Sequence, residues 1–297
     1  RDGDYAGKGI PMEWPRNVAE VPAEKVQDLK LDAVIFQSPE QYMNEQYEIL
    51  SEEQQMLPKI YLEHQLPSEN VADAPHLIND PNSLLVHTTA FNDLMWDSGQ
   101  TPTQVVDHGV LIRQGIQYSG DLARGIVVMN DLGAGNRRLG LDLYHKIRQR
   151  VPVDLIGKGS EGIPGGLGEI SHAELPGFIA HYRFFLNPAR YASLGLAVCE
   201  AMMVGMPVIG IATAEMAAVV RNGVSGYLDT NINKLIERMG ELIKDPSHAH
   251  RLSRGAYRYA RQRFNIKRFV KRWDEILDSI SAPMAESMMS GSLLRVG

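Results

Sequence analysis

The stretch Ser193 to Gly210, SLGLAVCEAMMVGMPVIG, is almost all apolar or small, yet it contains one carboxylate, Glu200. A glutamate is rarely fully buried unless another group pairs with it, so Glu200 either reaches solvent or serves a ligand. The pattern predicts a helix over 193–204 that ends at a Gly-Met-Pro turn and leads into a buried strand. The start of such a helix offers free N–H groups and a positive dipole end, which suit an anion.

Gly195, at this predicted helix start, would let a phosphate approach the backbone closely. Glu200 follows five residues later, roughly 7.5 Å along the axis at about 1.5 Å per residue. This spacing suits a diphosphate at the helix start and a ribose whose hydroxyls donate hydrogen bonds to the carboxylate. The alternative is an amphipathic helix that carries Glu200 on its solvent-facing edge.

The elements that must position this helix are short apolar runs that alternate with helical patterns, which is typical of parallel α/β architecture. The runs predict two series of strands, at 31–38, 58–64, 83–89 and 103–110, and then at 125–131, 152–159, 182–188 and 207–213. Helical patterns occur in the second series at 137–150, 172–181, 193–204, 214–222 and 233–244. Continuous apolar strands separated by helices predict sheets that are covered on both faces.

Two such series predict two Rossmann-like lobes, with a polar, glycine-containing connection near 113–124. The opening residues 1–22 carry too many Gly, Pro and charged residues for a core strand, so we expect a reduced N-terminal lobe. The expected organisation is an N-terminal Rossmann-like lobe at 1–118, a C-terminal Rossmann-like lobe at 119–262, a terminal helix at 263–280 and a flexible tail at 281–297.

Composition sets broad limits on the function. The chain has 297 residues, 44% of them hydrophobic, and a net charge of -6, which disfavours bulk binding to nucleic acid. Its single cysteine, Cys199, is expected to be a buried apolar residue, and a reducing, cytoplasmic setting fits. We find no run of the roughly 18 apolar residues that a membrane span needs, and we expect no signal peptide.

The segment SLGLAVCEAMMVGMPVIGIATAEMAAVVRNGVSGYL, residues 193–228, resembles the donor-site signature of retaining GT-B glycosyltransferases. That signature reads roughly E-G-F-G-L-x-x-x-E-A-M-A-x-G-x-P-V-V and, after a gap, E-V-V-x-D-G-x-x-G. Further stretches are similar to the family in the same order: VVDHGV at 105–110, VDLIGKGSE at 153–161, EISHAELPGFIAHYRFFLNP at 169–188 and RFNIKRFVKRWDEIL at 263–277. The resemblance implies the GT-B architecture, with a terminal helix that crosses back to the first lobe.

The resemblance also implies roles for individual residues. Glu200 would bind the ribose of a nucleotide sugar, and Gly195 and Leu196 would offer backbone N–H groups to the diphosphate. The basic pair of the family matches only in part, because Asn130 stands near the expected Arg and Arg137 or Arg138 near the expected Lys. A guanidinium can grip a phosphate with two hydrogen bonds, so an arginine is chemically acceptable there.

Histidines close three strands of the first series. The family keeps a His at a strand end close to the reacting centre, and His64 matches it, which makes His64 the candidate catalytic residue. His87 and His108 are also expected to face the other lobe. The alternatives are a structural role for His64 and a simple turn residue at position 108.

Two positions depart from the signature. The first Glu of the spaced pair falls on Ala192, where Ser193, Tyr191 or Arg190 could substitute. The Glu of the later E-V-V falls on Ala218, although Glu215 lies one helical turn earlier and joins the candidate donor-binding residues. The missing acid at 192 leaves the sugar, and catalysis itself, open.

The function implied is transfer of a sugar from a UDP-sugar or GDP-sugar to a carbohydrate, lipid-linked or small-molecule acceptor, with retention and without a metal or further cofactor. The alternatives are a non-catalytic nucleotide-sugar or carbohydrate-binding module, a nucleotide-sugar epimerase and a two-lobed solute-binding protein. The DGD at 2–4 resembles a metal-binding motif, but we assign it no role.

One further pattern bears on partners. A helix expected from Arg251 to Arg272 carries nine Arg or Lys and no acid, which would suit either an anionic membrane or plain solvent.

Overall fold

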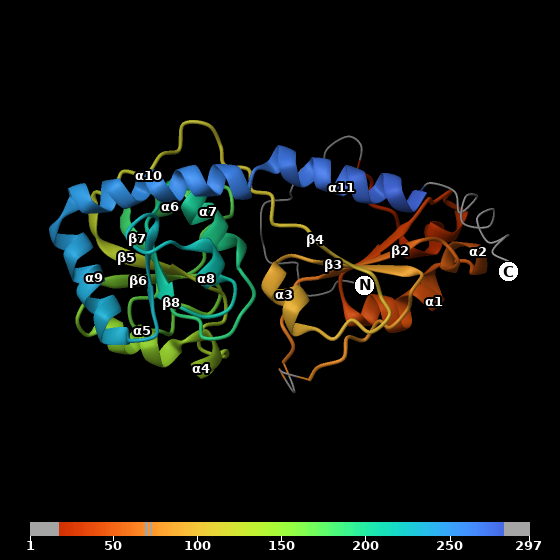
Figure 1. The fold of residues 1–297 in the computed structure, drawn as a ribbon, viewed down its shortest axis with the longest axis horizontal. Helices are drawn as coiled ribbons and strands as arrows, with labels where there is room; N and C mark the ends of the chain where they lie inside the picture. Colours follow the sequence, from red (N-terminus) through yellow and green to blue (C-terminus); the bar gives the residue numbers. More distant parts are fainter. Residues whose placement is uncertain (1–17, 69–70, 72, 282–297) are drawn as a thin grey trace, which may run out of the picture.

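The computed structural model describes residues 18–68, 71 and 73–281, and these form two α/β lobes that lie side by side (Figure 1). The first lobe has a parallel sheet of four strands in the order β1-β2-β3-β4, and the second has a parallel sheet of five in the order β6-β5-β7-β8-β9. The predicted α/β class is therefore confirmed. The DGD at 2–4 and the tail from residue 282 lie outside the described residues.

The first lobe occupies the chain up to the connection after its fourth strand. Its elements are η1 (Ala23–Asp28), β1 (Val34–Phe36), η2 (Gln41–Glu45), α1 (Gln46–Ile49), α2 (Glu52–Gln55), β2 (Lys59–Glu63), β3 (Ser83–His87), α3 (Ala90–Met95) and β4 (Thr103–Val105).

The second lobe begins with its own first strand and is followed by two long helices. Its elements are β5 (Leu122–Val128), α4 (Asn136–Leu139), α5 (Leu141–Arg148), β6 (Val153–Ile156), α6 (Leu175–Ile179), β7 (Tyr182–Asn187), α7 (Leu196–Val204), β8 (Val208–Ile211), α8 (Met216–Val219), β9 (Gly226–Asp229), α9 (Ile232–Lys244), α10 (Pro246–Arg263) and α11 (Ile266–Ser281).

Every predicted strand overlaps an observed one, but the sequence pattern missed β9. This strand is short and begins with Gly226, a residue that weakens a strand signal. Only glycine fits there, because a Cβ at position 226 would lie 1.8 Å from the carbonyl oxygen of Val208 on the neighbouring strand. The glycine that hides β9 from the sequence pattern is therefore what lets it pair with β8.

The single helix expected over 251–272 was wrong, because two helices meet at Phe264 and Asn265. The side chain of Asn265 accepts hydrogen bonds from the backbone N–H groups of Lys267 and Arg268 and so caps the second helix. The ring of Phe264 is fully buried against the second lobe. The buried ring of Phe264 and the cap at Asn265 together end α10 and start α11.

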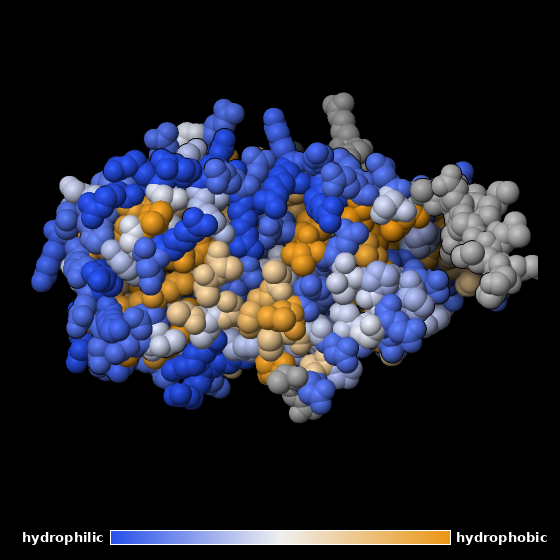
Figure 2. All heavy atoms as spheres, in the orientation of Figure 1, coloured by the Kyte–Doolittle hydropathy of each residue, from blue (hydrophilic) through white to orange (hydrophobic). Residues whose placement is uncertain are grey.

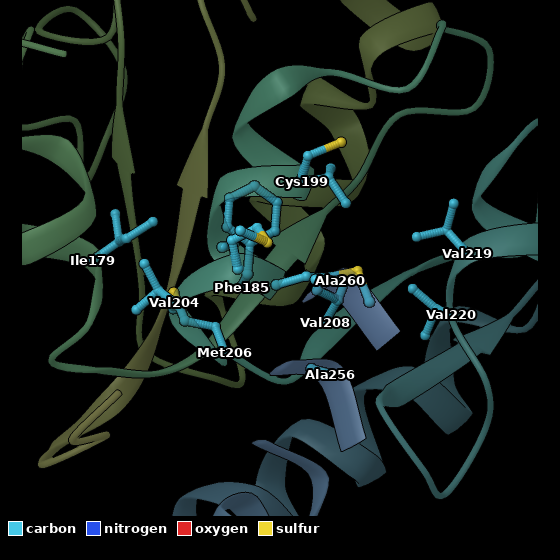
Figure 3. Packing of buried hydrophobic residues seen from close by; sticks show 14 of the residues in the cluster. Ile179, Phe185, Cys199, Val204, Met206, Val208, Val219, Val220, Ala256 and Ala260 are labelled. Carbon is cyan, nitrogen blue, oxygen red and sulfur yellow. The ribbon is translucent and has the colours of Figure 1, made fainter. Parts of the chain in front are cut away.

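Helix α7 lies in the core of the second lobe, with every residue from Val198 to Val204 buried. Helix α10 packs against it through Ala256 and Ala260, whose small side chains allow close approach, and all of these belong to one apolar cluster (Figure 3). The start of α7 is therefore held rigidly at the carboxyl end of the sheet, where parallel α/β sheets bind their ligands.

Helix α11 leaves the second lobe and covers one face of the first sheet, as the resemblance implied (Figure 1). Phe269, Trp273 and Ile276 on this helix pack with Ile60 and Val86 of the sheet. The two helices α10 and α11 thus run along one edge of the molecule and tie the lobes together.

Gly109 is expected to be essential for this tie. A Cβ at position 109 would lie 2.5 Å from the Cβ and Cγ atoms of Phe269, so Gly109→Ala should push α11 away and destabilise the chain by about 1–3 kcal/mol. The matched control is Gly240→Ala inside α9, where an added Cβ meets nothing within 4 Å and should stabilise by about 0.5–1 kcal/mol. Urea unfolding of both variants checks this, and equal stabilities would contradict it.

Candidate functional site

A cavity of about 340 Å³ lies where β5 and β7 end and α7 begins. Gly195 is the N-terminal cap of α7, no side chain caps this helix among the described residues, and the space beside the Gly195 Cα is open to at least 4 Å. The lining residues include Asn130, Leu139, Ala192, Ser193, Gly195 and Leu196. The helix start that the sequence predicted as an anion site therefore faces an open cavity.

Glu200 is buried one and a half turns along α7, with a side chain that is 6% exposed. The amphipathic alternative, in which this carboxylate lies on a solvent-facing edge, is wrong. Burial raises the pKa of Glu200 above its ordinary value, and His172 opposes that shift. A buried carboxylate in so apolar a helix needs a hydrogen-bonding partner.

That partner is His172, whose Nε2 lies 2.6 Å from Glu200 Oε1. Sequence reasoning missed this residue, which stands in the loop before α6 and is itself 78% exposed. Ser171 positions the loop, because its carbonyl oxygen accepts hydrogen bonds from the N–H groups of Glu174 and Leu175. The only signal was a histidine inside EISHAEL, a segment already noted for its resemblance, and nothing in its spacing connects it to Glu200.

The first lobe brings two histidines toward the start of α7. His108 Nε2 lies 3.0 Å from the carbonyl oxygen of Leu194, the residue directly before Gly195. Burial lowers the pKa of His108, and its hydrogen bond to the Leu194 carbonyl oxygen opposes that shift. His64 follows β2 and its Nε2 is 3.1 Å from Gln37 Oε1. Desolvation also lowers the pKa of His64, which favours the neutral ring.

His87 does not face the other lobe as expected. It is fully buried, with its Nε2 3.6 Å from Asp93 Oδ1, and burial lowers its pKa. It therefore lies within the first lobe rather than at the candidate site.

Ser193 and Glu215 form contacts between the lobes. Ser193 lines the cavity and its hydroxyl exchanges hydrogen bonds with the side-chain amide of Asn92 on α3, at 3.1 and 3.2 Å. Glu215 is buried, and its Oε2 accepts a hydrogen bond from the N–H of Phe91 at 3.0 Å. Its other oxygen pairs with Arg263, which also donates to Asp107 at 2.8 Å.

The structure does not bring Arg137 and Arg138 into the cavity. Both are exposed on α4, and Arg137 pairs with Asp142 at 3.0 Å. Asn130, at the position where the family has an arginine, does line the cavity, and its Oδ1 accepts the N–H of Lys158. Leu139 of the same short helix also lines it, so the two arginines lie next to the cavity rather than in it.

Ala192 lines the cavity, so the acid missing from the signature leaves an apolar wall there. Of its possible substitutes, Arg190 is held by Asp142 through two hydrogen bonds of 2.7 and 2.8 Å. The hydroxyl of Tyr191 is buried and has no hydrogen-bond partner among the described residues. Ser193 is the substitute that is both polar and on the cavity wall.

Over residues 18–68, 71 and 73–281, no group of three or more His, Cys, Asp or Glu residues is arranged to hold a metal ion. In the same ranges no helix combines the length and the apolar character that crossing a bilayer requires.

Comparison with known proteins agrees with this geometry. Residues 166–259 match the family model of glycosyl transferases group 1. Sucrose synthase 2 from Hordeum vulgare is 28% identical over 164 residues, which cover 51% of this chain and only 20% of that enzyme.

Solved structures share the fold over most of the chain. Sucrose-phosphate synthase from Thermosynechococcus elongatus has a TM-score of 0.66 at 16% identity, covering 84% of this chain and 74% of that one. HepE from Anabaena, in complex with UDP and glucose, has a TM-score of 0.62 at 17% identity, covering 75% and 72%. The two lobes therefore have the fold of the GT-B glycosyltransferases, and within the second lobe residues 166–259 resemble glycosyl transferases group 1.

Proposed function

We propose that this chain transfers a hexosyl group from a nucleoside-diphosphate sugar, UDP- or GDP-linked, to a carbohydrate, lipid-linked or small-molecule acceptor. The observation that carries the proposal is the pair formed by the open start of α7 and the buried carboxylate of Glu200 on the same helix. The start of α7 and Glu200 both lie within the group 1 match over 166–259. The structure of HepE, which shares the fold, contains UDP and glucose.

The donor would lie along α7. The diphosphate would accept hydrogen bonds from the backbone N–H groups of Gly195 and Leu196 at the start of α7, where the helix dipole also favours negative charge. The ribose hydroxyls would donate to Glu200, whose Oε2 is left available when Oε1 contacts His172. Arg137 and Arg138, next to the cavity on α4, are our candidates for the remaining phosphate charge.

In the transfer step, the bond between the anomeric carbon and the diphosphate oxygen breaks, and the acceptor hydroxyl forms the new bond. The electron pair of the broken bond leaves with the diphosphate, which then takes the proton of the acceptor. The helix start stabilises that developing charge because its dipoles are already oriented before the reaction begins. His64 would meet the sugar from the first lobe as a neutral imidazole that donates or accepts a hydrogen bond. We propose retention of configuration and no requirement for a metal.

A second candidate function is binding of a nucleotide sugar without transfer. Ala192 favours it, because the cavity wall is apolar where the family signature has an acid. An epimerase would need further carboxylates near the sugar, and Ala192 and Ala218 supply none.

Release of nucleoside diphosphate from a panel of UDP- and GDP-sugars, with and without candidate acceptors, separates the two. We expect release that requires an acceptor, and His64→Ala should lower kcat by roughly 10- to 100-fold if its hydrogen bond to the sugar strengthens in the transition state. Donor binding without turnover across a broad panel would favour the binding module instead.

A further inference from the structure

A row of unpaired cations lies along the solvent side of α10 and the start of α11. Its members, called the basic row below, are Arg251, Arg254, Arg258, Arg261 and Lys267, all of them exposed. Their spacing by three or four residues places the four arginines of α10 on one face of that helix. The opposite face is buried through Ala249, Leu252, Ala256 and Ala260. Burial of that face orients the four arginines of α10 toward solvent.

The charge of the basic row is not neutralised within the described residues. No acid occurs from Pro246 to Trp273, and over residues 18–68, 71 and 73–281 no ion pair involves any of the five side chains. The other cations of these helices behave differently. Arg263 and Arg268 pair with Asp107, and Lys271 and Arg272 pair with Glu275. These cations have carboxylate partners, whereas the basic row has none among the described residues. Its one charge contact in that part of the chain is the guanidinium of Arg261 over the ring of Tyr257.

The row forms a long and open surface. From Arg251 to Lys267 it extends roughly 24 Å at about 1.5 Å per residue, and Figure 2 shows strongly hydrophilic side chains along this edge of the molecule. Apolar groups accompany it. The side chain of Tyr257 lies within the row and is 46% exposed. Leu111, 77% exposed, belongs to the loop between β4 and β5 that rises past α10 in Figure 1, and Tyr118 of this loop stacks edge-on against His250 of α10.

We propose that the basic row docks the chain on an anionic lipid bilayer, with Leu111 and Tyr257 at the interface. A helix face that combines several cations with exposed apolar groups is the chemistry that recognises anionic headgroups. Tyr257 is the one exposed aromatic side chain from Arg251 to Lys267, so this stretch lacks the series of aromatic platforms that single-stranded nucleic acid requires, and the chain is acidic as a whole. The exposed cations on one helix face therefore suit a flat anionic surface better than they suit a nucleic-acid strand. The proposal does not depend on glycosyl transfer.

The test is co-sedimentation of the full chain with phosphatidylcholine vesicles that contain roughly one third phosphatidylserine. We expect binding that decreases with salt and that is absent from pure phosphatidylcholine. Each arginine near an anionic surface raises the membrane partition constant by about five-fold. Replacing Arg251, Arg254, Arg258 and Arg261 by Gln should therefore lower that constant by several hundred-fold.

The matched control replaces four exposed cations elsewhere on the second lobe by Gln: Lys146, Arg148, Arg150 and Lys158. The change in net charge is the same, but Lys146 and Arg148 lie on α5, on the far side of the lobe from α10 (Figure 1), Arg150 follows α5 and Lys158 follows β6. The partition constant should therefore change less than about three-fold. Thermal unfolding of both variants verifies the fold. Equal losses in the two variants, or tight binding to duplex DNA with none to the vesicles, would overturn the proposal.

Discussion

Replacing Glu200 by Gln is expected to lower the affinity for UDP or GDP by roughly 10- to 100-fold, while the fold stays as stable as that of the wild type or becomes slightly more so. The loss follows because hydrogen bonds to a carboxylate contribute about 1.5–3 kcal/mol each, about twice those to an amide. The unchanged stability follows because Glu200 is buried and, within the described part of the chain, its one side-chain partner is an exposed histidine. Isothermal calorimetry and thermal unfolding measure the two quantities.

The pH dependence of the wild type, compared with that of Glu200→Gln, separates the effect of Glu200 on nucleotide binding from its effect on folding. The folded-state pKa of Glu200 is raised above the ordinary value of 4.5, so its protonated form stabilises the fold and that stabilisation is lost as the pH rises through the folded pKa. Nucleotide affinity has the opposite sign, because the ribose needs the ionised form. Wild-type affinity should fall on acidification toward that of Glu200→Gln, whose own affinity should stay flat.

The control for both measurements is Glu174→Gln, a carboxyl in the same loop region that contacts Ser171 rather than α7. Its nucleotide affinity should remain within about two-fold of the wild type, because nothing links it to the ribose. If Glu200→Gln bound UDP and GDP as tightly as the wild type, the ribose assignment would be wrong.

Replacing Arg263 by Met is expected to destabilise the chain by about 3–5 kcal/mol, the largest effect that we expect on stability. Arg263 is 16% exposed and joins Asp107, on the segment that follows the first sheet, to Glu215 in the second lobe. Removing it leaves the carboxylate of Glu215, 3% exposed, buried without its cation, which is far more costly than losing a surface pair. Urea unfolding followed by circular dichroism measures the loss.

Arg268→Met is the matched control. This arginine pairs with the same Asp107 at 3.6 Å but is 62% exposed, so its loss should cost less than about 1 kcal/mol. Adding Glu215→Gln to Arg263→Met should restore part of the stability, because the amide oxygen still accepts the N–H of Phe91 and no charge remains buried. Equal costs for Arg263→Met and Arg268→Met would show that the buried pair does not hold the lobes.

The same contacts show what the sequence could and could not predict. Apolar runs located the strands, and the pattern around Gly195 and Glu200 located the helix whose start faces the cavity, because both depend on local periodicity. The partners of that site are distant in sequence. His172 is 28 residues from Glu200, Asn92 is 101 from Ser193, and Phe91 is 124 from Glu215. No local pattern encodes such pairs, since they arise only when sheets and lobes pack.

Two local errors also have physical causes. Strand β9 was missed because Gly226 is required by a close approach to Val208 and gives no strand signal. The break between α10 and α11 was missed because Asn265 acts as a cap, a role that depends on the direction of the chain after Phe264. Arg137 and Arg138 lie exposed on α4 beside the cavity rather than in its lining, and their role in phosphate binding stays a prediction.

The most direct test of nucleotide-sugar transfer begins with the donor site itself. Titration of the wild-type chain with UDP and with GDP by isothermal calorimetry should show saturable binding of at least one of them, at one site per chain, that Glu200→Gln weakens by roughly 10-fold or more. A folded wild-type chain that shows no binding to any nucleoside diphosphate would contradict the donor site and, with it, the proposed glycosyl transfer.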